Sequence, residues 1–105
     1  MTEAEREARE IIKAMVPSGG EYNPDWAQLG DALTGALRGD ASAAATLLRV
    51  FNEPGFAVSN SCHEQRYAAL GLALLGASEA RPHIERAMRI NLNARAIPLA
   101  LELLA

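Results

Sequence analysis

The sequence is poor in cysteine and in aromatic residues. Cys62 is the only cysteine, so the chain can form no internal disulfide, and nothing in it indicates an oxidising compartment. Aromatic residues make up 5% of the chain and hydrophobic residues 50%. The core must therefore be aliphatic and rich in alanine, which favours closely packed helices over strands and argues against disorder.

Long hydrophobic runs are also absent. The longest one, residues 67–77 with two glycines in it, is about half the roughly 20 residues that span a bilayer. The N-terminus, Met-Thr-Glu-Ala-Glu-Arg-Glu, is too charged to hold the apolar stretch of a secretory signal. We therefore expect a cytoplasmic protein with no membrane contact.

The charge is acidic overall and unevenly distributed. The formal net charge is −3, and the excess of acidic residues lies in residues 1–60, whereas residues 61–105 carry one more base than acid and both histidines. A nucleic-acid binder must neutralise several phosphates at once, and this chain has no cluster of basic residues that would do so. We expect no nucleic-acid partner; a nucleic-acid-associated regulator that uses a ridge of arginines is kept as an alternative.

The length of 105 residues predicts one domain, and the start and stop signals predict five or six short helices within it. A first helix is expected over residues 2–16. Thr2 and Glu5 form a capping box at its start, and Pro17 begins the stretch that should end it. The fold class that follows is all-α.

Two helical hairpins are expected after this helix. The first covers residues 25–52 and turns at Gly39, and the second covers residues 61–91 and turns at Gly76. The first helix of the second unit is apolar nearly all the way round, which is typical of a helix at the centre of a fold. The short turns predict antiparallel hairpins stacked side by side.

The two units are related by a constant offset of 37 residues, which lies in the range of helical-repeat families. The matching pairs are Ala32/Ala69, Leu33/Leu70, Ala36/Ala73, Leu37/Leu74, Gly39/Gly76, Ala43/Ala80, Leu47/Ile84, Arg49/Arg86 and Phe51/Met88.

This pattern resembles HEAT-like α-helical repeats over about residues 25–105. The resemblance is carried by Arg-Tyr-Ala-Ala-Leu-Gly-Leu-Ala-Leu-Leu-Gly at residues 66–76 and by Ile84, Ala87 and Met88 in the helix that follows. It implies a small curved stack of hairpins, an α-α superhelix, that is used to recognise proteins. It carries over no catalytic residue, because the family has none in common.

Five basic residues form the candidate partner-binding site. Arg49 and Arg86 hold equivalent positions in the second helices of the two units, and Arg81, His83 and Arg89 lie on the same helix as Arg86. A basic stripe of this kind suits an acidic partner surface, or a carboxylate or phosphate gripped by arginine. The alternative is a solvated helix face that neighbouring glutamates balance.

Cys62 is the candidate for an enzymatic alternative, a small cysteine-dependent enzyme or redox sensor. It lies in the predicted first turn of a helix, where the dipole favours a thiolate, but a nucleophile also needs a base, and only His83 could approach it through the fold. The spacing of Cys62, His63, Glu64 and His83 is not that of a metal site. We therefore expect no enzyme, no metal and no cofactor.

Two apolar segments are further candidates for contact with a partner. Phe56 and Val58 lie in an irregular stretch, and we expect them to fold back onto the end of the stack rather than protrude. The last helix is expected over residues 94–105, with Pro98 in its first turn or at a kink.

The last helix has leucines on several sides and no following helix to cover it. It therefore needs a surface to cover it, which the first helix of the same chain could supply. A second copy could also supply it, giving a homodimer through Ile97, Leu101 and Leu104. Taken together, the sequence predicts a non-enzymatic protein–protein interaction module: a small inhibitor, adaptor or immunity-type protein that acts by occluding its partner.

Overall fold

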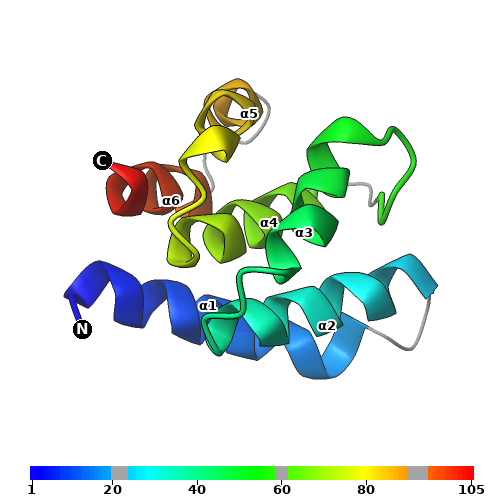
Figure 1. Cartoon of the computed structure of the whole chain (residues 1–105), viewed down its shortest axis with the longest axis horizontal. Helices are drawn as coiled ribbons and strands as arrows, with labels where there is room; N and C mark the ends of the chain where they lie inside the picture. Colours follow the sequence, from blue (N-terminus) through cyan, green and yellow to red (C-terminus); the bar gives the residue numbers. More distant parts are fainter. Residues whose placement is uncertain (20–23, 59–61, 90–94) are drawn as a thin grey trace.

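A computed structural model describes residues 1–19, 24–58, 62–89 and 95–105, and the regular structure within these ranges is entirely helical (Figure 1). The predicted all-α fold class is therefore confirmed. The elements are α1 (Glu3–Gly19), α2 (Pro24–Leu37), α3 (Ala43–Asn52), α4 (His63–Leu74), the single 3₁₀ turn η1 (Ser78–Ala80), α5 (Arg81–Met88) and α6 (Ala96–Leu104). No helix in the described ranges is long and apolar enough to cross a membrane.

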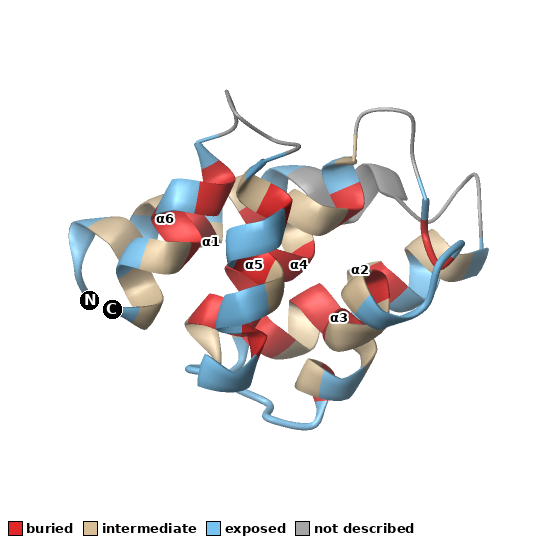
Figure 2. Cartoon of the chain, turned by 90° about the horizontal axis from the view of Figure 1, so that it is seen from above, coloured by how far each residue is buried: buried red, intermediate tan, exposed pale blue. Residues whose placement is uncertain are grey.

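Helix α4 lies at the centre of the fold, as its apolar sequence predicts. It contacts α1, α2, α3, α5 and α6, and Leu70 and Leu72 are completely buried on it (Figure 2). Gly71 lets the first hairpin approach closely, because a Cβ at this position would lie 2.8 Å from Leu47 Cδ1 and 3.1 Å from Leu33 Cδ2. The core thus forms where a helix without a polar face is surrounded by others.

The turns that follow α2 and α4 have the same backbone geometry. Gly39 has φ +77° and Gly76 has φ +68°, a left-handed conformation that costs glycine little. In each turn, two backbone hydrogen bonds close a Schellman motif that ends the helix. The bonds are Gly39 N–H to Ala36 O at 3.1 Å and Asp40 N–H to Gly35 O at 2.9 Å, matched by Gly76 N–H to Ala73 O and Ala77 N–H to Leu72 O, both at 3.0 Å.

The helices after these turns pack differently. Helix α3 lies against both α2 and α4, whereas α5 contacts α4 at few positions and packs mainly on α6. The chain first forms the 3₁₀ turn η1 from Ser78, and the α-helix begins only at Arg81. The N–H that would bond to the Ser78 carbonyl is the one that Pro82 lacks, so the α-helix can begin only with this proline in its first turn.

Helix α1 is longer than predicted and is tied to both halves of the molecule. It continues past Pro17 to Gly19, with the proline in its last turn. The predicted Thr2 cap is formed, with Glu5 N–H donating to Thr2 Oγ1 at 3.1 Å. Arg9 Nη1 donates to the carbonyl of Leu37 at 2.8 Å and so caps the end of α2.

An ion pair joins α1 to Arg95, the residue that precedes α6. Arg95 Nε and Nη2 donate to the two carboxylate oxygens of Glu7, at 2.9 and 3.1 Å. These hydrogen bonds hold the pKa of the Glu7 carboxyl below its usual value and raise the pKa of Arg95.

Other helices of the same chain cover most of α6. It packs on α4, α5 and α1, and Pro98 lies in its first turn, which is the first of the two predicted placements. Ile97 is completely buried, so its predicted place on a dimer surface is wrong. Leu101 and Leu104 are partly buried against the core. Residues 61, 90, 91 and 94, at the predicted ends of the second hairpin and of the last helix, lie outside the described residues.

Candidate functional site

Helix α5 presents most of the candidate basic residues to solvent. Ile84 and Ala87 are buried on one side, and the helical period leaves Arg81, Arg86 and Arg89 exposed on the other. Arg81 Nε donates to Glu85 Oε1 at 3.0 Å, an exposed pair that stabilises the helix only slightly. Arg89 has no ion-pair partner among the described residues, so its charge remains available.

A hollow of about 150 Å³ lies beside this basic face, between α3, α4 and α5. We call it the α5 hollow; it is lined by Val50, Phe51, Gln65, His83, Arg86 and Ala87. An engineered apolar cavity of about this size holds one benzene molecule, so the α5 hollow has room for the end of one side chain.

Histidine and arginine side chains form one rim of the α5 hollow. The His83 ring stacks on Phe51 with the ring centroids 5.8 Å apart and an interplanar angle of 17°. Arg86 Nη2 lies 2.5 Å from His83 Nδ1, so the guanidinium donates and the imidazole nitrogen accepts. A charged donor is therefore held beside an apolar and aromatic wall, an arrangement that suits a carboxylate next to an apolar group.

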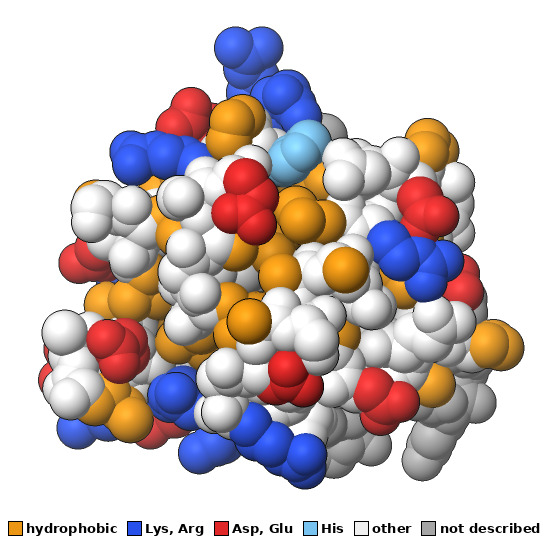
Figure 3. All heavy atoms as spheres, viewed as in Figure 1, with side chains coloured by type: hydrophobic (Ala, Val, Ile, Leu, Met, Phe, Trp, Pro, Cys, Tyr) orange, Lys and Arg blue, Asp and Glu red, His pale blue; other side chains and the backbone are white. Residues whose placement is uncertain are grey.

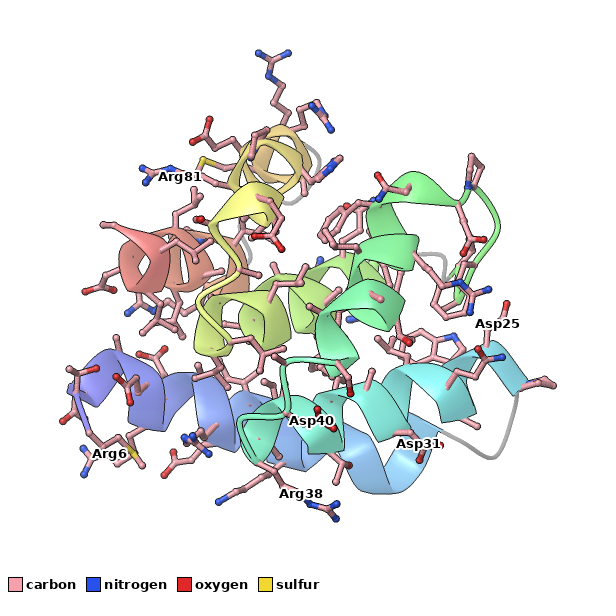
Figure 4. The ribbon with its side chains drawn as sticks, in the orientation of Figure 1. Arg6, Asp25, Asp31, Arg38, Asp40 and Arg81 are labelled. Carbon is pink, nitrogen blue, oxygen red and sulfur yellow. The ribbon has the colours of Figure 1, made fainter. Side chains whose placement is uncertain are left out.

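Basic and hydrophobic side chains lie close together on the surface around α5. Basic side chains gather over α5 at the top of the view in Figure 3, and hydrophobic side chains are visible below them, between α5 and α3. Arg38 and Arg6 lie on the opposite side of the molecule from Arg81, near α2 and α1 (Figure 4). Arginines on the opposite side of the molecule can therefore serve as controls for substitutions on α5.

Arg49, the fifth candidate basic residue, has contacts on another side of α3. It forms an ion pair with Glu53, donates from Nη1 to Gln28 Oε1 at 2.8 Å, and its Cζ lies 4.1 Å from the centroid of the Phe56 ring. Side chains two positions apart in a helix point about 200° apart, so Arg49 faces away from the side of α3 where Phe51 meets His83. The equivalence of Arg49 and Arg86 in sequence does not extend to their contacts.

Cys62 lies in a second hollow of about 240 Å³, between the end of α3, the start of α4 and the segment from Glu53 to Val58. We call it the loop hollow. Cys62 is partly buried, and His83 lines the α5 hollow rather than this one. The approach of His83 to Cys62 that the enzymatic alternative would need is not found, because the imidazole is held by Phe51 and Arg86.

Phe56 and Val58 in this segment differ in their burial. Phe56 is 5% exposed, as expected of a residue that folds back, whereas Val58 is 61% exposed and lines the loop hollow. Sequence reasoning could not separate them, because both are apolar residues in the same irregular stretch.

A polar hollow of about 300 Å³ lies between α2 and α3, with Asp31 and Asp40 on its walls (Figure 4). Asp40 accepts from the Ser42 hydroxyl at 2.7 Å and from the Ser42 N–H at 3.0 Å, and these bonds hold the pKa of Asp40 below its usual value. They complete a local turn before α3. Within the described ranges, no three His, Cys, Asp or Glu side chains are placed to hold a metal ion.

Four residues of the α5 hollow were missed at the sequence level: Val50, Phe51, Gln65 and Ala87. The periodicity of α3 predicts that Val50 and Phe51 face the core, and no local signal tells that α5 leaves a space beside them. Comparison of the chain with protein-family models, curated proteins and solved structures finds no match.

Proposed function

We propose that this chain is a protein-interaction module that binds its partner through the exposed face of α5 and the α5 hollow. The observation that carries the proposal is the placement of Arg86 and His83 on the rim of a hollow whose lining mixes apolar and polar side chains. Arginine and aromatic side chains around a small pocket are typical of the residues that contribute most to protein–protein binding.

The charge of α5 indicates the kind of partner. Arg81 and Arg86 lie on α5 and Arg89 directly follows it, in a chain of net charge −3. The one acidic residue of α5, Glu85, is paired with Arg81. This local reversal of charge favours an acidic protein surface. The resemblance to HEAT-like repeats supports the same class of function, and an inhibitor or adaptor that occludes its partner would need no chemistry of its own.

The test is capture of partners by the full chain under native conditions, with quantitative mass spectrometry of the proteins retained. We expect proteins that the wild type retains to be lost from a variant with both Arg86→Glu and Arg89→Glu. These exposed positions should tolerate the change within about 0.5 kcal/mol each.

Arg38→Glu is the matched control, because Arg38 follows the end of α2 as Arg89 follows the end of α5. Arg38→Glu and Arg89→Glu therefore each place a negative charge near a helix C-terminus, where the dipole opposes it. Equal retention by all three proteins, or no specific retention by the wild type, would overturn the proposal.

A further inference from the structure

The α5 hollow and the loop hollow adjoin each other along α3. Val50, Phe51 and Gln65 line both, so a ligand segment that crosses Phe51 would meet the two hollows in succession. Their volumes, about 150 and 240 Å³, lie below the range of roughly 300–1,000 Å³ that is usual for small-molecule and cofactor sites. Taken singly, each hollow has room for one side chain.

The two hollows differ in the chemistry at their rims. The α5 hollow has Arg86 and His83, which supply a positive charge and donors. The loop hollow has Val58, which with Met1 is one of the large hydrophobic residues left exposed within the described ranges. Glu53 also borders this hollow, but its carboxylate is engaged by Arg49.

The exposure of Val58 is a consequence of how its neighbours are anchored. Phe56 is buried beneath the Arg49 guanidinium, and Ala57 is completely buried with its N–H donating to Asp25 Oδ2 at 3.2 Å. Ala57 holds a left-handed φ of +54°, a conformation that persists only where surrounding contacts enforce it. With both preceding residues fixed inward, Val58 is presented at the mouth of the loop hollow.

We propose that the two hollows together bind one extended segment of the partner protein, with an acidic side chain at Arg86 and an aliphatic side chain against Val58. The inference rests on the proposed function and names the motif that the α5 surface recognises. Charge complementarity selects the acidic group, and the exposed apolar rim selects the aliphatic one. Gln65 and Phe51, between the hollows, separate the two side chains of the ligand.

The probe is a phage-displayed library of random peptides, selected on the immobilised full chain. We expect the selected peptides to share an acidic and an aliphatic residue at a constant spacing. One such peptide is then labelled, and its affinity is measured by fluorescence anisotropy against the wild type and against Arg86→Gln, Val58→Ser and the control Arg38→Gln.

Each change in the peptide should lose its effect on affinity when the protein residue that it contacts has been replaced. Replacing the acidic residue of the peptide by its amide should weaken binding about tenfold to the wild type and to Arg38→Gln, and hardly at all to Arg86→Gln. Replacing the aliphatic residue by alanine should cost about fivefold on the wild type and hardly anything on Val58→Ser.

This inference would be overturned if the selected peptides lack an acidic residue or if no peptide is selected. It would also be overturned if the peptide changes weaken binding to Arg86→Gln and Val58→Ser as much as binding to the wild type. The proposed function is judged separately, by whether native partners are lost with Arg86→Glu and Arg89→Glu. A partner that is captured while the peptide motif fails would show that α5 binds a folded surface instead of an extended segment.

Discussion

The chain turns from helix to helix after α2 and again after α4 with the same pair of backbone hydrogen bonds, yet the helices that follow find different neighbours. Helix α3 is held between α2 and α4, with Leu47 completely buried. Helix α5 packs mainly on α6, and its basic face stays in solvent. A shared local turn therefore does not impose a shared packing, and the hollow beside α5 lies where the two hairpins differ.

The largest difference in stability between the two hairpins is expected when the equivalent core residues Leu47 and Ile84 are each replaced by alanine. Leu47→Ala should lower the free energy of unfolding by about 2–5 kcal/mol, because α2 and α4 enclose Leu47 and the cavity cannot collapse. Ile84→Ala should cost about 2 kcal/mol, near the lower end of that range, because α5 contacts α4 at few positions and can shift toward the space that is left.

Urea unfolding of the two variants measures this difference. Equal losses would mean that α5 is held as firmly as α3, and the contrast between the hairpins would have to be abandoned.

The turns themselves should behave alike. Gly39→Ala and Gly76→Ala each force a Cβ into a left-handed conformation, and neither Cβ would meet another atom within 4 Å. We therefore expect each substitution to cost about 1–2 kcal/mol, from the backbone alone. Thermal or urea unfolding should give values that agree within about 0.5 kcal/mol; a larger gap would show that packing beyond the turn contributes to one of them.

The smallest effect is expected at the ion pair that links α1 to the second half of the chain. Arg95 holds the pKa of Glu7 below its usual value. A carboxyl with a depressed pKa in the folded state contributes stability above its unfolded pKa and loses it as the pH falls through the folded one. The difference in Tm between the wild type and Glu7→Gln should therefore be largest near neutral pH and vanish in acid.

Glu10→Gln, on the same helix, is the control, since Glu10 has no ion-pair partner in the described part of the chain. A Tm difference for Glu7→Gln that persists unchanged to acid pH would contradict the assignment.

Much of the fold could be predicted because its signals are local. Gly39 and Gly76 mark turns that glycine alone adopts cheaply, and the apolar sequence of α4 places it at the centre. Pro82 sets the start of α5 at Arg81, because it lacks the N–H that an earlier start would use. The candidate site was predicted in part. Four of its five basic residues lie on α5 or directly after it, and Arg49 is placed elsewhere by its contacts with Gln28, Glu53 and Phe56.

The sequence by itself determined the all-helical class, the helix ends at the two glycines and the identity of the central helix, since each depends on residues within a few turns of one another. Tertiary structure alone decided that Ile97 is buried, that Val58 is exposed beside a buried Phe56, and that Arg86 and His83 border a hollow with Phe51. These outcomes depend on which distant helices meet, and periodicity along one helix carries no information about the neighbour that will cover it.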